Sequence, residues 1–196
     1  MRLLGKQIGF ALPEGHFTMK AILEEIKKIV SAGADVFPLI LETEHNQLQD
    51  ERLVHERRLL EQITGREMMT TSLSEETRDD LDFDLLVVAP CPANFLTKLL
   101  NTRTAAIPLS NAVHHLETGR PVVLALVANG DSENLFHNVA QILNLKNFYL
   151  VPFGPVDKDD RQIFLSRLDL LCDTVQYALA SKQLQPVYFE QCWLPH

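Results

Sequence analysis

The chain has 196 residues and a formal net charge of −8, with 26 acidic against 18 basic residues. This balance argues against sequence-independent binding of nucleic acid, which needs clustered Lys and Arg. No apolar run is long enough to span a bilayer, so no membrane association is expected. The three cysteines, Cys91, Cys172 and Cys192, show no paired spacing, and this fits the reducing cytoplasm in which we expect the protein.

Apolar periodicity and breaker residues predict strands that alternate with helices. In chain order we expect strand 7–12, helix 17–30, strand 34–41, helix 53–63, edge strand 68–71, strand 85–89, helix 92–100, helix 105–116, strand 121–127, helix 133–143, strand 148–152 and helix 161–180. A strand-helix alternation of this kind predicts a three-layer α/β/α sandwich with a mainly parallel, doubly wound, Rossmann-like sheet. We expect one domain over residues 1–196, with residues 183–196 as a C-terminal tail.

The most informative segment spans residues 82–98. Residues 85–89 are wholly apolar, which is typical of a strand buried on both faces of a parallel sheet. Pro90 lacks the N–H that a ladder needs and Pro92 suits a first helical turn, so we expect the strand to end before Pro90. Ala93 then lets a planar ring lie close, and the Asn94 amide can donate to and accept from the edge of that ring. This loop lies at the carboxyl edge of the sheet, where open α/β folds bind ligands.

Other loops are expected at the same edge. Asn129 and Gly130 follow the strand 121–127, Asn138 comes later in the next helix, and residues 151–155 form a third loop. Because parallel strands share one polarity, these segments converge on the Asn94 loop and predict a pocket. Lys98, one turn after Asn94, either reaches an anionic ligand or is simply solvated.

The first strand-to-helix turn, residues 12–18, is a candidate phosphate site because a helix N-terminus presents free N–H groups. A plain helix-capping turn is an equal alternative, and His16 is either a ligand donor or an exposed loop residue. Glu14 is unusual here, since its carboxylate competes with a phosphate for the positive end of the helix.

Several chemistries lack support in the sequence. Neither the dinucleotide fingerprint nor the P-loop motif is present. His114 and His115 are adjacent in a predicted helix and cannot chelate one metal together, so no metal site is expected. Cys91 is either a reactive thiol or a small buried filler, and we expect the filler.

The segment Ala89-Pro90, Asn94, Lys98 resembles the A-P-x-x-x-N-x-x-x-K element of the FMN-binding flavoproteins that include the homo-oligomeric cysteine decarboxylases of coenzyme A and lantibiotic synthesis. Over nearly its full length the chain is more similar to the family of dipicolinate synthase B subunits from spore-forming bacteria. The similarity rests on residues 5–10 with His16 and Thr18, and on residues 63–65, 120–124, 146–154 and 183–187.

The resemblance implies a flavoprotein-like sheet, a homo-oligomer and FMN as cofactor. It implies that the cofactor is met by Gly15, His16, Thr18, Pro90, Ala93, Asn94, Lys98, Asn129 and Asn138, with the first three at its phosphate end. It also implies an A subunit as partner, which carries an NAD(P)-binding domain. Together the two subunits would form dipicolinate from a small dihydrodipicolinate-type precursor during sporulation. No catalytic residue is assigned.

Two alternatives remain open. Relatives carry Thr-Gly-Ser before the histidine, whereas this chain has Pro13-Glu14-Gly15, which favours a non-catalytic partner subunit that has lost FMN. The other alternative is an FMN-dependent decarboxylase acting on a peptidyl or pantothenoyl cysteine.

Overall fold

The computed structural model describes residues 3–13, 19–41, 51–70, 83–100, 115, 118–129, 133–158 and 161–192. The strands are β1 Gln7–Pro13, β2 Asp35–Leu41, β3 Met69–Thr70, β4 Leu85–Pro92, β5 Val122–Asn129, β6 Phe148–Leu150, β7 Phe153–Lys158 and β8 Arg161–Ser166. The helices are α1 Met19–Ser31, α2 Glu51–Thr64, α3 Ala93–Leu100, α5 Glu133–Asn144 and α6 Leu171–Leu179, preceded by the 3₁₀ turn η4 Leu168–Leu170. The predicted helix 105–116 lies almost entirely outside the described residues.

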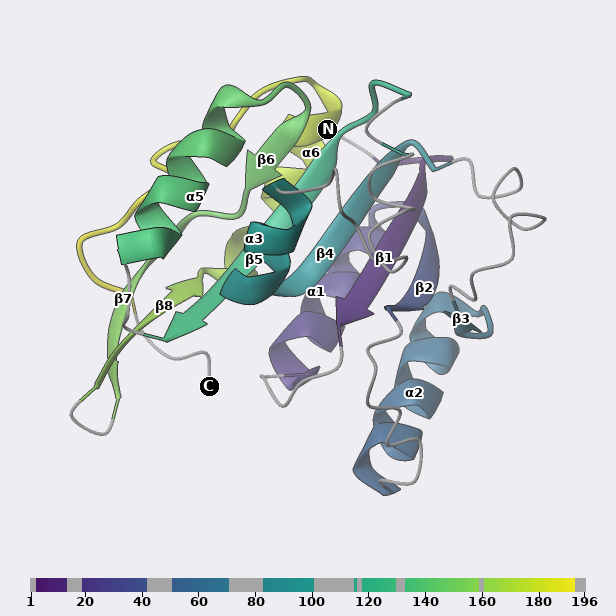
Figure 1. The fold of residues 1–196 in the computed structure, drawn as a ribbon. Helices are drawn as coiled ribbons and strands as arrows, with labels where there is room; N and C mark the ends of the chain where they lie inside the picture. The colour runs from purple at the N-terminus through teal and green to yellow at the C-terminus, as the bar shows by residue number, and fades with distance from the viewer. Residues whose placement is uncertain are drawn as a thin grey trace.

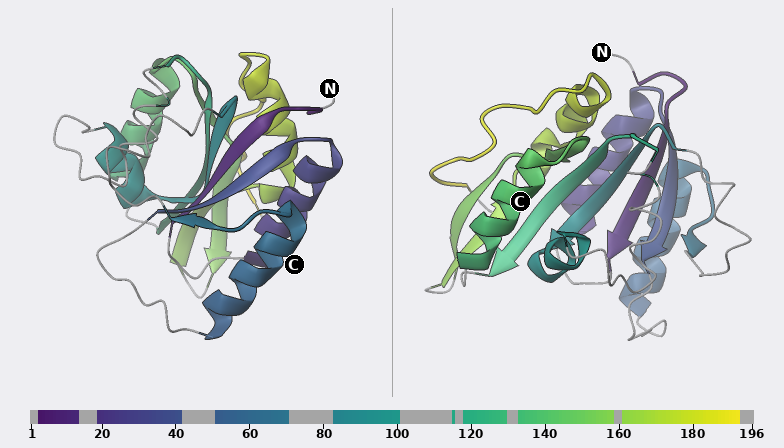
Figure 2. Two further views of the ribbon diagram at one scale, coloured as in Figure 1. Left: turned by 90° about the vertical axis from the view of Figure 1, so that its right-hand side faces the viewer. Right: turned by 45° about the horizontal axis from the view of Figure 1, so that its top comes forward.

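The sheet has eight strands in the order β3-β2-β1-β4-β5-β8-β7, with β6 also paired to β5. Its first five positions are parallel, and the predicted edge strand is confirmed as β3. Helices α1, α2 and α6 cover one face and α3 and α5 cover the other, as Figures 1 and 2 show. The predicted three-layer, mainly parallel α/β/α fold is confirmed.

The two faces of β4 explain why this strand is apolar throughout. Leu85, Val87 and Ala89 pack into the core under α1 and α6. Leu86 and Val88 pack into the core under α3 and α5. Successive side chains point to opposite faces of a strand, so both faces of β4 need apolar residues.

Gly9 on β1 allows one close approach that this packing requires. A β-carbon at this position would lie 2.5 Å from Cδ2 of Phe83, a separation that atoms do not tolerate. Phe83 is 5% exposed and lies just before β4, so the missing side chain of Gly9 leaves room for the Phe83 ring beside the sheet.

Halfway along β5 its neighbour changes from parallel β6 to antiparallel β8. Val122 to Leu124 pair with β6, and Val127 to Asn129 pair with β8. The buried Ser166 hydroxyl joins the two halves, because it accepts the Leu126 N–H at 2.7 Å and donates to the Val151 carbonyl at 3.1 Å. Where β8 takes the place of β6 beside β5, a side-chain hydroxyl thus replaces backbone hydrogen bonds between strands.

The prediction of one helix over residues 161–180 is wrong in its first half. Residues 161–166 form β8, which pairs with β7 and inserts antiparallel beside β5. Only α6 is helical for more than one turn in this region. The prediction rested on the helical spacing of four apolar residues, Phe164, Leu168, Leu171 and Val175. Phe164 nevertheless belongs to a strand, because a short apolar run does not distinguish the helical period from the strand period.

The predicted third loop at residues 151–155 is wrong for its last three residues, because β7 begins at Phe153 and only residues 151–152 lie between strands. Gly154 and Pro155 suggested a loop, yet an outer strand accommodates proline. The segment after α6 then runs along β7. Phe153 N donates to Val187 O and Phe189 N to Phe153 O, both at 2.9 Å, and Cys192 N donates to Pro155 O at 2.8 Å.

Among the helices in the described part of the chain, none combines the length and apolar character needed to cross a membrane.

Candidate functional site

The carboxyl end of β4 leads directly into α3 and forms the described part of the candidate site. The prediction that the strand ends at residue 89 and that Pro92 opens the helix is wrong, because β4 continues to Pro92 and α3 begins at Ala93. The Ala89–Pro90 peptide bond is cis, and the register with β5 shifts between Val88 and Cys91. The irregular stretch accommodates a proline that a regular ladder would exclude.

Asn94 lies in the first turn of α3 and is exposed. Its Oδ1 accepts the Phe95 N–H at 2.8 Å, so the side chain satisfies one of the free donors at the helix N-terminus. The amide nitrogen of Asn94 has no partner among the described residues and keeps both N–H groups for another acceptor. Asn94 therefore offers donors, while its oxygen is engaged locally.

Asn138 lies on α5, is 9% exposed, and donates from Nδ2 to Thr97 Oγ1 at 2.9 Å. Thr97 in turn donates its hydroxyl to the Ala93 carbonyl at 3.0 Å. The structure thus places Asn138 next to α3, on which Asn94 lies. The Asn138 amide N–H, however, is engaged in the hydrogen bond that joins α5 to α3. Thr97 was missed at the sequence level, because no motif links two residues that lie 41 positions apart.

The Cys91 thiol is completely buried, and this burial raises its pKa well above the ordinary range. A thiol that stays protonated is a poor nucleophile. The expected role of Cys91 as a small buried filler fits this setting, since the residue packs in the core beneath α3 and α5.

Some of the remaining predicted residues are described by the structure and others are not. Lys98 is exposed on α3, one turn after Asn94. Asn129 is the last residue of β5 and pairs with Ile163, so its placement in a loop is wrong, although it does lie at the carboxyl edge. Gly15, His16 and Thr18 lie outside the described residues, as does Glu14. Of the predicted residues, the structure therefore places Pro90, Ala93, Asn94 and Lys98 on β4 and α3, with Asn138 of α5 bonded to α3 at Thr97.

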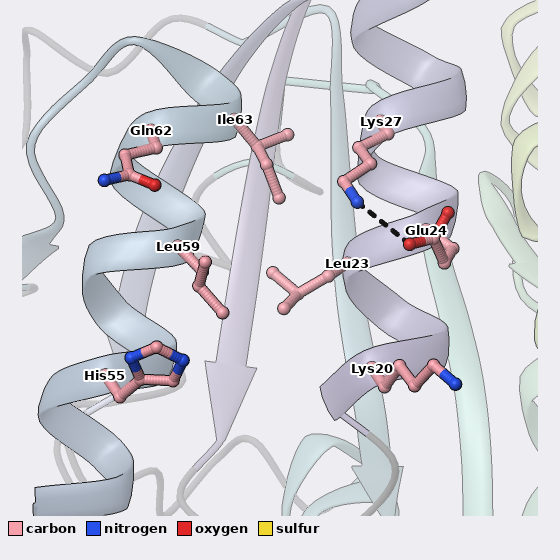
Figure 3. Close-up of a pocket in the computed structure, with 8 residues that line it drawn as sticks. All are labelled: Lys20, Leu23, Glu24, Lys27, His55, Leu59, Gln62 and Ile63. Atoms are coloured by element: carbon pink, nitrogen blue, oxygen red, sulfur yellow. Dashed lines mark hydrogen bonds and ion pairs between the residues drawn. The ribbon is translucent and has the colours of Figure 1, made fainter.

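A groove of about 440 Å³ lies elsewhere, between α1 and α2. Leu23, Leu59 and Ile63 form its apolar part, and Figure 3 shows Lys27 bonded to Glu24 along α1 at 2.9 Å. Lys20, His55 and Gln62 complete the lining. Because α1 and α2 cover the face opposite α3, this groove is separate from the described part of the candidate site.

The described residues of the site fit a planar polar ring better than a metal ion. No group of three or more His, Cys, Asp or Glu within the described ranges is placed to hold a metal. At the start of α3, the small Ala93 is followed by the exposed Asn94 amide, whose N–H groups have no partner among the described residues. Such a surface suits a flat ligand that carries hydrogen-bond acceptors at its edge.

Comparison with solved structures identifies the fold as the Rossmann-like fold of flavoproteins. The FMN-dependent cysteine decarboxylase SpaF is similar with a TM-score of 0.60 and 18% identity, over 91% of this chain and 97% of that one. A PPC decarboxylase is similar with a TM-score of 0.57 and 16% identity, over 88% and 97%. At these identities the likeness shows the fold alone.

Two relatives are more similar to this chain and show to which family it belongs. The B subunit of dipicolinate synthase from Bacillus subtilis (strain 168) is 30% identical over 191 residues, which is 96% of each chain. The crystal structure of the corresponding B subunit from Bacillus halodurans C has a TM-score of 0.82 and 27% identity, over 98% of this chain and all of that one. The chain belongs to the family of dipicolinate synthase B subunits. No protein-family model matches it.

Proposed function

We propose that this chain is the flavin-type subunit of a dipicolinate synthase in the cytoplasm of sporulating cells. It acts with an NAD(P)-binding A subunit to form dipicolinate from a dihydrodipicolinate-type precursor. The observation that carries the proposal is the full-length similarity to two B subunits of this enzyme. The decarboxylase alternative has weaker support, because SpaF is only 18% identical.

The residues at the start of α3 suit the cofactor side of this proposal. Ala93 leaves room for the isoalloxazine ring of FMN, and the Asn94 amide donates to an acceptor on the ring edge. When bound, FMN supplies hydride-accepting chemistry. The protein would orient the flavin ring. The Thr97–Asn138 hydrogen bond fixes α3 against α5, so the N–H donors of Asn94 are held in one position.

A second candidate is a non-catalytic partner subunit that has lost FMN. Glu14 in the sequence favours it, because a carboxylate next to a helix N-terminus opposes a phosphate there. The local engagement of the Asn94 oxygen also favours it, since that oxygen is not free to accept from a ring N–H.

Titration with FMN separates the flavin-type subunit from the non-catalytic partner subunit. We expect flavin absorbance bands to co-elute with the wild-type chain and calorimetry to give micromolar-range binding. Ala93→Leu should weaken that binding at least tenfold by filling the space beside the ring, whereas Ala180→Leu, the same change at an exposed position after α6, should not. Absence of FMN binding by a folded wild-type chain overturns the flavin proposal and favours the partner-subunit candidate.

The partnership needs its own experiment. The A subunit, co-expressed with the tagged chain, should co-purify in fixed stoichiometry, and the pair should form dipicolinate from the dihydro precursor with NAD(P). If the A subunit alone gives the same rate and no complex forms, the proposed partnership is wrong.

A further inference from the structure

The groove between α1 and α2 has an apolar floor. Leu23, Leu59 and Ile63 point into the space between the two helices, as Figure 3 shows. Leu23 is 7% exposed, and Leu59 and Ile63 are partly exposed where they pack on the core of this face of the sheet. The cavity of about 440 Å³ lies within the size range of small-molecule sites, roughly 300–1,000 Å³. A ligand with an apolar body would therefore fit here and remove these three side chains from water.

Polar side chains line one end of the groove, where a closely packed pair of helices would carry apolar ones. Lys20 precedes Leu23 by three residues and His55 precedes Leu59 by four, so each continues a row of side chains that lines the groove. Figure 3 places Lys20 and His55 at the same end. Both are exposed, and neither makes a hydrogen bond or an ion pair with another described residue. The groove thus ends beside an ammonium and an imidazole that are available to a ligand.

The charges that line the groove sum to a positive value. Glu24 is the only carboxylate among the described lining residues, and it is paired with Lys27 at 2.9 Å. Lys27, and after it Lys20, hold the pKa of the Glu24 carboxyl below its usual range, so this group stays ionised and its charge is matched by Lys27. Lys20 is left as an unmatched positive charge in a chain whose net charge is −8. Local positive charge on an acidic protein favours an anion at that place.

We propose that the groove between α1 and α2 binds a small carboxylate with an apolar body. The body lies on the apolar floor, and the carboxylate accepts hydrogen bonds from Lys20 and His55 at the end of the groove. A cation of the same shape would meet the Lys20 ammonium and be rejected. Because the groove lies on the face opposite α3, this ligand is distinct from one held at the described part of the candidate site.

The first test is calorimetry of the full chain with decanoate and with decyltrimethylammonium, which carry apolar tails of the same length and opposite charges. Excess FMN is added to each titration, so that a flavin site is not the one measured. We expect decanoate to saturate one site per chain and to bind about tenfold more tightly than the cation. The net charge of −8 alone would favour the cation, so this order of affinities is specific to the groove.

Two pairs of variants locate the site. Leu59→Trp fills the groove and should weaken decanoate binding about tenfold or more. Leu145→Trp, the same change at an exposed leucine before β6, should not. Lys20→Glu reverses the charge at the end of the groove and should also weaken binding, whereas Lys146→Glu changes the net charge equally at an exposed position elsewhere and should not. Unfolding curves show whether each variant is folded, and the two surface lysine variants decide the matter if Leu59→Trp does not fold.

Several results overturn the proposal. Equal or tighter binding of decyltrimethylammonium would show that the groove does not select an anion. Unchanged affinity in folded Leu59→Trp or in Lys20→Glu, or equal losses in their controls, would place the decanoate site elsewhere. Absence of decanoate binding would favour a protein segment as the occupant of the groove. None of these outcomes depends on the proposed function, because neither the flavin nor the A subunit takes part in the binding measured.

Discussion

Asn138 donates its amide N–H to Thr97 Oγ1 at 2.9 Å, and this bond joins the two helices on one side of the sheet. Asn138 is 9% exposed whereas Thr97 is exposed, so the loss of Asn138 removes one hydrogen bond but leaves the Thr97 hydroxyl within reach of water. The bond therefore links the stability of the α3–α5 layer to the position of Ala93 and Asn94.

We expect Asn138→Ala to lower the free energy of unfolding by about 0.5–1.5 kcal/mol. If FMN binds at α3, its affinity should fall as well, because α3 is held less firmly. Urea unfolding and FMN titration measure the two effects. Asn134→Ala, an exposed asparagine one turn earlier on α5, is the matched control and should change neither. Unchanged stability in Asn138→Ala would show that the bond contributes nothing net.

Gly154 is predicted to be intolerant of any side chain. A β-carbon there would lie 2.5 Å from the Phe189 carbonyl oxygen and 2.9 Å from Cys192 Sγ. Gly154→Ala should displace the C-terminal segment from β7 and make it sensitive to limited proteolysis. Gly119→Ala is the control, since its cost comes from a positive φ of 75°, with the nearest atom, Asn147 Nδ2, 4.0 Å from a β-carbon, and it should leave the segment protected. Protection that survives Gly154→Ala would contradict the prediction.

The Gln183 side chain acts as an extra peptide group beside β6. Its Oε1 accepts the Leu150 N–H at 2.9 Å, and its Nε2 donates to the Leu150 carbonyl at 2.7 Å. Gln183→Glu replaces the donor by an oxygen facing that carbonyl, so we expect a loss of about 2–3 kcal/mol. Gln185→Glu, the same change at an exposed position, should cost little, and thermal unfolding compares the two. Equal Tm values for both variants would refute this account.

Asp84 should make stability depend on pH in the acid range. Burial raises the pKa of its carboxyl, but the 2.8 Å ion pair with Lys6 and the bond from the Gln7 N–H outweigh that effect and leave the pKa below its usual range. The folded state therefore gains stability above the unfolded pKa of about 3.9. That gain is lost as pH falls through the lower, folded pKa.

Asp84→Asn should accordingly be less stable than the wild type at pH 7, with a difference that shrinks below about pH 4. Urea unfolding across the range from neutral to acid pH measures this convergence. Asp173→Asn, at an exposed position on α6, is the control. A difference between Asp84→Asn and the wild type that stays constant with pH would contradict the expected sign.

Glu14→Gly tests the electrostatic objection to FMN. If FMN binds with its phosphate at the first helix, removal of the carboxylate should tighten binding, and more so at low salt. Glu190→Gly, an exposed acidic residue of the C-terminal segment, should have no effect. Unchanged affinity in Glu14→Gly would remove the objection.

The sequence predicts the parallel half of the sheet well. The residues of β4 and β5 are apolar at successive positions because both faces are covered, and such runs are seldom found elsewhere. It fails for β7 and β8, where Gly154 and Pro155 suggest a loop and Phe164 continues the apolar spacing of α6. Pairing with β7 and with β5 makes residues 161–166 a strand, and the pairing with β5 depends on contacts far apart in the chain.

The candidate site, too, is predicted from the sequence only in part. Ala93 and Asn94 follow a buried parallel strand, so their place at the carboxyl edge follows from topology. The bond between Thr97 and Asn138, by contrast, depends on how α3 and α5 pack, which periodicity does not specify. The phosphate-end residues Gly15, His16 and Thr18, which lie outside the described residues, remain a prediction.

One of the two edge strands of the sheet, β7, is already occupied by the chain's own C-terminal segment. Peptide groups on a bare edge invite strands from other molecules and start polymerisation. Here the peptide groups of Phe153 and Pro155 bond to Val187, Phe189 and Cys192. The edge is closed only after residues 187–192 have been synthesised, so nascent chains, and chains clipped before this segment, are the forms most exposed to aggregation.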